Sequence, residues 1–157
     1  MHRIDYSKHY IDANDNKFVK KALNSNALTK GNNLKKFEKV IKNFVNSKFS
    51  IVLSNASSAL LVSLKALDVK EDDIIWCSDN TYISTINCAI HLRAKIDLID
   101  INIKDYNICV ENLKKKLLIA KKNKKLPKIL IVTHIAGYPC DLKIIYKLSQ
   151  KYNFKIV

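Results

Sequence analysis

The sequence predicts an α/β fold with a mostly parallel sheet that helices cover on both faces. From residue 49 onward, short apolar stretches with the length of strands alternate with longer stretches of helical periodicity. The short stretches are mostly apolar, which is typical of strands buried on both sides in a parallel sheet. Two amphipathic helices are expected before this alternation begins.

The first helix is expected to start at Asp12 or Asp15, since either carboxylate can cap it. Its apolar face carries Phe18, Val19, Ala22 and Leu23. After a break at residues 24–33, a second helix places apolar residues at three- and four-residue steps. These residues are Leu34, Phe37, Val40, Ile41, Phe44 and Val45. We therefore divide the chain into N-terminal helices (residues 1–48) and a sheet region (residues 49–157).

The alternation in the sheet region predicts the order of its elements. Strands are expected at residues 49–53, 74–78, 96–101, 129–133 and 154–157. Helices are expected at residues 57–67, 82–92, 111–122 and 141–152. Glycine is scarce, with two residues in the chain, so we expect Gly31 and Gly137 to stand where another residue could not replace the backbone geometry.

Length and composition indicate a soluble globular protein with the size of one domain. No apolar run approaches the roughly 18 residues that span a bilayer. The first six residues lack the apolar core of a secretory signal, so we expect a cytoplasmic protein. Metal catalysis and a disulfide framework have no support, because cysteines and histidines are widely spaced. They are Cys77, Cys88, Cys109 and Cys140, and His2, His9, His91 and His134.

The formal net charge of +14 raises the alternative of a non-catalytic, basic module that binds nucleic acid. Much of the excess lies in the lysine-rich residues 114–125. Tyr106 is the one aromatic residue near this stretch, and no recognisable nucleic-acid signature accompanies it. We therefore expect a solvated basic face, and nucleic acid is not among the expected partners.

Residues 53–61, with the sequence LSNASSALL, predict a phosphate-binding turn. Small hydroxylic residues follow an expected strand and open a helix, where free N–H groups and the helix dipole favour an anion. The alternative is a serine-rich helix cap that binds nothing. The glycine patterns of P-loop and dinucleotide-binding proteins are absent from the sequence.

Two further segments follow expected strands at the edge where open α/β sheets bind ligands. In residues 79–87, Tyr82 can stack on a planar ring, or it can be a rim or core aromatic. In residues 132–141, His134 precedes Gly137, for which we expect a positive φ. The alternative for this segment is a simple turn between strand and helix with a histidine in the core.

Taken in order, five segments carry a family resemblance: LTKG at 28–31, NASSAL at 55–60, TYISTIN at 81–87, LIDI at 98–101 and HIAG at 134–137. The whole chain resembles the DegT/DnrJ/StrS family of sugar aminotransferases that depend on pyridoxal phosphate (PLP). The resemblance implies the N-terminal part of the large domain of a fold-type-I PLP-dependent transferase. The opening of the chain is most similar to members in pseudaminic acid synthesis. Those enzymes transfer an amino group from glutamate to C4 of a UDP-linked 4-keto-6-deoxy sugar.

The resemblance also implies residue roles. Ala56 and Ser57 match the pair that holds the PLP phosphate, Tyr82 matches the aromatic on the cofactor ring, and the turn with His134 and Gly137 lies beside the cofactor. The positions at or near the sugar-nucleotide pocket are Tyr6, Thr29, Lys30, Gly31 and Ser58. The family builds its active sites between two subunits, so a homodimer is implied.

Some positions depart from the family pattern. Lys30 stands where glutamine is usual, Arg93 where glycine is usual, and Ser78 and Asp79 where a proline is common. The family's Schiff-base lysine and the carboxylate beside the pyridine nitrogen have no match, so no catalytic residue is nominated. We expect an inactive fragment whose C-terminal remainder is absent and whose apolar face is exposed. A 3-amino-sugar transaminase, a dehydratase variant and a stand-alone PLP-binding remnant remain open alternatives.

Overall fold

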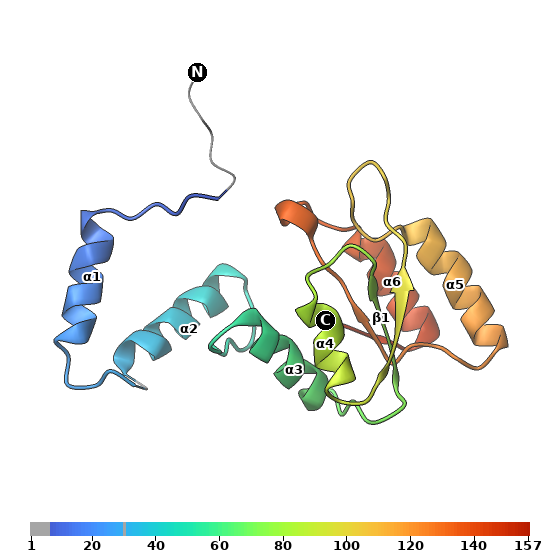
Figure 1. Ribbon diagram of the computed structural model, residues 1–157, viewed down its shortest axis with the longest axis horizontal. Coiled ribbons are helices and arrows are strands. Elements are labelled where there is room, and N and C mark those ends of the chain that lie inside the picture. Colours follow the sequence, from blue (N-terminus) through green and yellow to red (C-terminus); the bar gives the residue numbers. More distant parts are fainter. Residues whose placement is uncertain (1–6, 30) are drawn as a thin grey trace, which may run out of the picture. The chain divides into compact units, whose positions relative to one another are not determined.

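The computed structural model describes residues 7–29 and 31–157, which form two compact units (Figure 1). The first unit is Met1–Val52 and the second is Leu53–Val157. The second unit contains the sheet and the residues that line the candidate cofactor cavity described below. Within the described ranges, no helix has both the length and the apolar character needed to cross a membrane.

The first unit contains two helices, α1 (Ala13–Leu23) and α2 (Asn32–Phe44). Asp12 caps α1, as expected, because its Oδ1 accepts hydrogen bonds from the N–H groups of Asn14 (2.7 Å) and Asp15 (3.0 Å). The Asp15 carboxylate in turn accepts the N–H of Asp12 at 3.0 Å, which completes a capping box. This local network explains why the helix begins where the sequence predicts.

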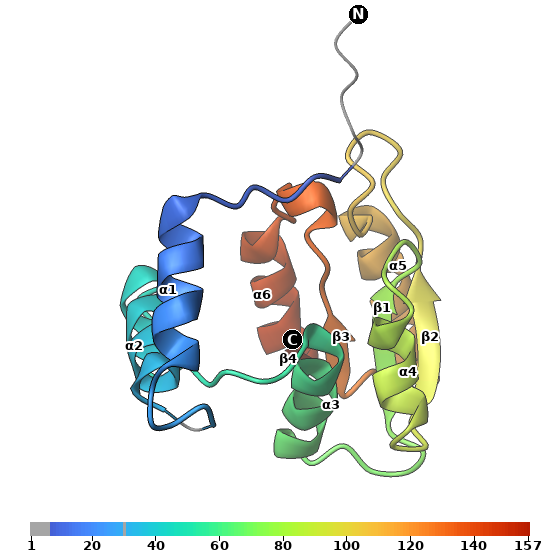
Figure 2. The same ribbon diagram turned by 60° about the vertical axis from the view of Figure 1, so that its left-hand side comes forward.

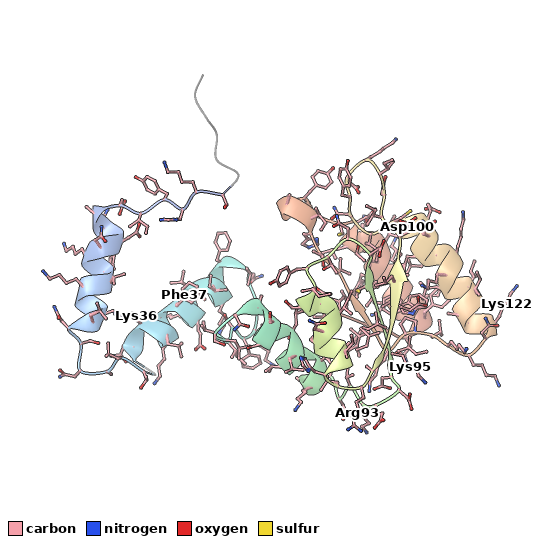
Figure 3. The ribbon with its side chains drawn as sticks, in the orientation of Figure 1. Lys36, Phe37, Arg93, Lys95, Asp100 and Lys122 are labelled. Atoms are coloured by element: carbon pink, nitrogen blue, oxygen red, sulfur yellow. The ribbon has the colours of Figure 1, made fainter. Side chains whose placement is uncertain are left out.

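Most apolar side chains of α1 and α2 are exposed, and neither helix contains a buried residue. On α2, Phe37 (labelled in Figure 3) is half exposed, and Phe44 is 86% exposed. An amphipathic helix normally gains its stability by burying such a stripe. Within the described part of the first unit, the stripe on α2 therefore lacks a covering partner.

The second unit alternates helices with the strands of one four-stranded parallel sheet, which confirms the predicted α/β fold. The helices are α3 (Ala56–Ala66), α4 (Ser84–Ile90), α5 (Val110–Lys122) and α6 (Leu142–Tyr152), with a short 3-10 turn, η1 (Ile135–Gly137). The strands are β1 (Ile74–Ser78), β2 (Lys95–Ile99), β3 (Ile129–Ile131) and β4 (Lys155–Ile156), and they are arranged in the order β2-β1-β3-β4.

Helices cover both faces of this sheet, with α3 and α4 on one face and α5 and α6 on the other (Figure 2). The two-residue period of a strand separates the two cores. In β1, Ile75 and Cys77 pack with Leu64 of α3, whereas Trp76 packs with Leu113 of α5. The parallel register pairs Ile75 with Ile96 of β2 and with Ile129 of β3. The central strands β1 and β3 are mostly buried and mostly apolar, as their sequences indicated, whereas the edge strand β2 carries the exposed Lys95 and Asp97.

The strand predicted at residues 49–53 is wrong, because this segment is not a strand in the structure. Phe49 and Ile51 are 73% and 77% exposed, so their alternation does not mark a buried sheet face. The N–H of Val52 donates to the Glu38 carboxylate at 3.1 Å instead of joining a ladder. A strand needs a hydrogen-bonded neighbour, and apolar alternation in one segment cannot supply one.

Several helices end on a residue with positive φ that is not glycine. After α4, Arg93 has φ 56°; its N–H donates to the carbonyl of Ile90, and the next N–H, of Ala94, donates to that of Ala89. This pair of bonds is the Schellman motif, which usually places glycine at the position of Arg93. Figure 3 labels Arg93 at this turn. Arginine therefore occupies a backbone position that favours glycine.

The two glycines are explained differently. Gly137 has φ 80°, which confirms the expected positive value. Gly31 has φ −72°, an ordinary value, but a Cβ built there would lie 2.7 Å from the carbonyl oxygen of Ala27. The lack of space for a Cβ beside the Ala27 carbonyl, and not the φ angle, therefore accounts for glycine at position 31.

Candidate functional site

The N-terminus of α3 presents unsatisfied backbone donors at the carboxyl edge of the sheet. Asn55 caps the helix by accepting the N–H of Ser58 on its side-chain oxygen at 2.8 Å, while its carbonyl accepts the N–H of Ala59. Among the described residues, the N–H groups of Ala56 and Ser57 have no acceptor. Two free donors at the positive end of a helix dipole are suited to an anionic group.

Serine hydroxyls surround these donors. The Ser57 hydroxyl lies 2.8 Å from the hydroxyl of Ser84, which opens α4. One residue further along α3, the Ser58 hydroxyl lies 3.4 Å from that of Ser54. The corner between residues 53 and 58 therefore combines amide and hydroxyl donors, which is the chemistry that the sequence predicted for a phosphate.

Tyr82 lies in the turn between β1 and α4, and its side chain is 77% exposed. The ring lines a cavity of about 340 Å³ together with Ser57 and Ser58 of α3 and Ser84 of α4. This exposure excludes a core position for Tyr82 and leaves a stacking ring or a rim aromatic. An exposed ring beside a cluster of donors can cover a planar ligand whose anionic group binds at α3.

One face of α4 and the residue that follows it form another wall of this cavity, which the sequence analysis did not identify. Asn87, Cys88 and His91 line the cavity beyond Ser84. These four positions follow the spacing i, i+3, i+4 and i+7, which places them on one face of a helix. That spacing was visible in the sequence, but nothing local indicated that this face would meet α3.

Three threonine hydroxyls connect the ends of neighbouring strands at the same edge. Thr81 Oγ1 lies 2.9 Å from Thr85 Oγ1 and 2.9 Å from Thr133 Oγ1. Thr81 directly precedes Tyr82, and Thr133 directly precedes His134. The network therefore links the turn that carries the exposed tyrosine to the turn after β3.

The turn with His134 is held from two sides. The Nδ1 atom of His134 accepts the N–H of Cys140 at 3.1 Å, which fixes the orientation of the ring. Asn107, whose side chain is almost fully buried, accepts the N–H of Ile135 and donates to the carbonyl of Tyr138, both at 3.0 Å. These bonds support a turn in which Ala136 has φ 50°. His134 is exposed and is not among the residues lining the cavity, so a simple core histidine is also excluded.

The predicted sugar-nucleotide positions are only partly visible together. Tyr6 and Lys30 lie outside the described residues. Thr29 and Gly31 belong to the first unit, whereas Ser58 lines the cavity in the second. The structure thus brings Ser57, Ser58 and Tyr82 together and places Ala56 beside them.

The lysine-rich stretch lies on α5 and in the turn that follows it. Two of its side chains make ion pairs, Lys114 with Glu111 (2.7 Å) and Lys116 with Asp97 (2.6 Å). Lys116 also lies 5.2 Å from the centre of the Trp76 ring. Part of the positive charge on α5 is therefore balanced within the fold.

Thiol chemistry does not contribute to the cavity. Cys88 is buried, and burial is the largest cause that raises the pKa of its thiol. The Cys77 thiol behaves in the same way: burial, followed by the negative charge of its neighbours Cys88 and Asp79, raises its pKa to about 11. Both thiols therefore remain protonated near neutral pH.

The sequence matches the model of the DegT/DnrJ/EryC1/StrS aminotransferase family over residues 9–157. A curated relative from Campylobacter jejuni, UDP-4-amino-4,6-dideoxy-N-acetyl-beta-L-altrosamine transaminase, is 32% identical over 98% of this chain and 40% of its own length. An uncharacterised protein from Methanocaldococcus jannaschii is 33% identical over 86% of this chain and 33% of its own length. The chain therefore spans well under half of the curated relatives it matches.

Solved structures share the fold. An aminotransferase from Helicobacter pylori involved in the biosynthesis of pseudoaminic acid superposes with a TM-score of 0.85 and 25% identity, covering 97% of this chain and 40% of that one. An aminotransferase from Psychrobacter cryohalolentis gives a TM-score of 0.82 and 26% identity, covering 94% of this chain and 36% of that one.

Proposed function

Because this chain belongs to the DegT/DnrJ/EryC1/StrS aminotransferase family, we propose that it forms the cofactor-binding part of an enzyme that aminates a nucleotide-linked keto sugar. The cofactor of the family is pyridoxal phosphate. The observation that carries the proposal is the single cavity that combines the donors of α3 with the exposed ring of Tyr82.

The residues present fit the phosphate end of this cofactor. The N–H groups of Ala56 and Ser57, which have no acceptor among the described residues, would hold the phosphate together with the Ser57 hydroxyl, which now donates to Ser84. Tyr82 would cover the pyridine ring, and His134 would lie beside it. When bound, the cofactor supplies the electron sink that amino transfer requires.

The substrate side of the proposal rests on the curated relatives. We assign the amino donor as glutamate and the acceptor as a UDP-linked 4-keto-6-deoxy-N-acetyl sugar in pseudaminic acid synthesis. The Campylobacter jejuni relative, a transaminase named for a UDP-linked 4-amino-4,6-dideoxy-N-acetyl sugar, supports the choice of acceptor. Tyr6, Thr29, Lys30, Gly31 and Ser58 would contact the sugar nucleotide, and the intact enzyme would work as a cytoplasmic homodimer.

The 157 residues alone are proposed to bind the cofactor without completing the reaction. Amino transfer needs a lysine that bonds to the cofactor and moves a proton, and a carboxylate that keeps the pyridine nitrogen protonated. We place both groups in the part of the enzyme that corresponds to the unmatched length of the relatives.

Cofactor binding tests this assignment directly. Pyridoxamine phosphate is a suitable probe, because it lacks the aldehyde that would react with the many lysines of this chain. Ser57→Asp places a negative charge at the phosphate position and should weaken binding about tenfold or more, which corresponds to about 1.4 kcal/mol. Ser25→Asp adds the same charge in the first unit and should leave the affinity unchanged.

Tyr82→Ala should weaken binding of the same probe about threefold to tenfold, because stacking on a ring contributes about 0.5–1.5 kcal/mol. Isothermal titration calorimetry measures the affinity of pyridoxamine phosphate for the wild-type chain and for both variants. The site assignment is wrong if pyridoxamine phosphate binds equally to the wild-type chain, Ser57→Asp and Tyr82→Ala. Formation of 2-oxoglutarate from glutamate and a UDP-linked 4-keto sugar by this chain alone would instead contradict its proposed inactivity.

A further inference from the structure

Ser84 lies where it can act on the proposed phosphate site without touching the cofactor. It is the first residue of α4, its side chain is 9% exposed, and it lines the same cavity as Ser57. Its one hydrogen-bond partner among the described side chains is the Ser57 hydroxyl, at 2.8 Å. The contact joins α3 and α4 through two residues that are 27 positions apart in the sequence.

The donor and acceptor roles of the two hydroxyls indicate a role for Ser84. In the structure the Ser57 hydroxyl donates to Ser84. A phosphate oxygen accepts hydrogen bonds, so Ser57 must turn its one proton toward the phosphate when the cofactor binds. The Ser57 oxygen is then free to accept a proton from Ser84, and both hydroxyls can rotate to make this exchange.

We infer that Ser84 is a positioning residue for the cofactor phosphate: it donates to Ser57 and so orients the Ser57 hydroxyl toward the phosphate. The inference rests on the proposed function of the cavity. It assigns to Ser84 a reversal of the Ser57–Ser84 hydrogen bond on binding. A hydroxyl that accepts a hydrogen bond is also polarised, which strengthens the bond that it donates.

The orientation of the Ser57 hydroxyl matters because few cationic side chains line the described part of the cavity. Among the residues that the structure describes, the lining of the cavity includes His91 but no lysine or arginine, although the chain is strongly basic. Amide and hydroxyl donors therefore carry most of the attraction that this part of the site offers to a phosphate. A misdirected Ser57 hydroxyl would remove one donor and present an oxygen lone pair to an anion.

A purely structural bond between α3 and α4 would have different consequences, and two ligands separate the two roles. Pyridoxamine phosphate and pyridoxamine differ by the phosphate alone. Ser84→Ala should weaken binding of pyridoxamine phosphate about threefold and leave pyridoxamine unchanged. Ser84→Thr keeps the hydroxyl and should restore the wild-type affinity. Ser63→Ala, nearly two turns further along α3, is the matched control and should have no effect.

A double-mutant cycle tests whether Ser84 acts through Ser57. Ser57→Ala should weaken binding of pyridoxamine phosphate about fivefold. Adding Ser84→Ala should cause no further loss of affinity, because the Ser57 hydroxyl that Ser84 orients is already absent. Thermal melting of each variant checks that the fold is retained. Independent, multiplying losses in the double variant would overturn the inference, as would an equal loss of pyridoxamine affinity in Ser84→Ala.

The two proposals fail in distinguishable ways. If Ser57→Ala and Ser84→Ala both leave the affinity for pyridoxamine phosphate unchanged, the proposed cofactor site is wrong. If Ser57→Ala weakens binding while Ser84→Ala does not, the site stands and the role of Ser84 is refuted. If Ser84→Ala weakens the phosphate ligand alone and Ser84→Thr restores it, the inference is supported.

Discussion

The turn after α4 offers a quantitative test of how this glycine-poor chain ends its helices. Arg93 has φ 56°, and a left-handed backbone costs a residue with a Cβ roughly 1–2 kcal/mol. Glycine avoids this cost but loses about 0.5–1 kcal/mol more backbone entropy on folding. The ion pair of Arg93 with Glu71 (3.5 Å) is largely exposed, so its loss costs at most about 0.3 kcal/mol. After the loss of the ion pair is subtracted, Arg93→Gly should therefore stabilise the chain by about 0.5 kcal/mol.

Urea unfolding followed by the fluorescence of Trp76 measures this gain. Trp76 is the single tryptophan, and it lies fully buried in the core between the sheet and α5, so its emission reports on the second unit. Arg93→Ala removes the ion pair but keeps the Cβ, and it should give no gain. Asn153→Gly changes another positive-φ position, with φ 57°, where asparagine is already tolerated, and should gain less. The reasoning is refuted if Arg93→Gly unfolds at or below the wild-type urea midpoint, or if Arg93→Ala stabilises equally.

Two further predictions concern the cysteine thiols and the ion pair between Asp73, just before β1, and Lys128, just before β3. Iodoacetamide at pH 8 should modify the half-buried Cys109 well before Cys77, because burial raises the pKa of the Cys77 thiol to about 11. Mass spectrometry of peptides measures the order of labelling. Early labelling of Cys77 would contradict this prediction. Burial opposes ionisation of Asp73, but hydrogen bonds from Lys128 and from the N–H of Lys70 outweigh it and lower its pKa. Its stabilisation is present above the unfolded value of about 4 and is lost as the pH falls through the lower folded pKa. Asp73→Asn should thus cost about 0.5–1 kcal/mol at pH 7 and less at pH 3, and a constant difference between the two unfolding curves would refute it.

Local patterns in the sequence determined most of the elements. The strand at 74–78 was predicted with the bounds that the structure shows, and the helix at 111–122 differs by one residue. Both follow from short-range rules, since apolar runs mark buried strands and regular spacing marks helices. The cap at Asp12 depends on residues within three positions of it, so it too was predictable. The turn at residues 53–58, which we propose as the phosphate site, could be singled out for the same reason, because its amide and hydroxyl donors are contiguous in the sequence.

Only the tertiary structure decided which distant residues meet. The segment 49–53 has the composition of a strand, yet it has no neighbouring strand in the described residues. The contact of Ser57 with Ser84, and the bonds of Asn107 to the turn after β3, join positions that are 27 and 28 or more residues apart. Pairing, burial and hydroxyl geometry depend on how elements pack, and this information is absent from any local pattern. The residues that the sequence could name are therefore those whose chemistry is contiguous, whereas their supporting partners had to be read from the fold.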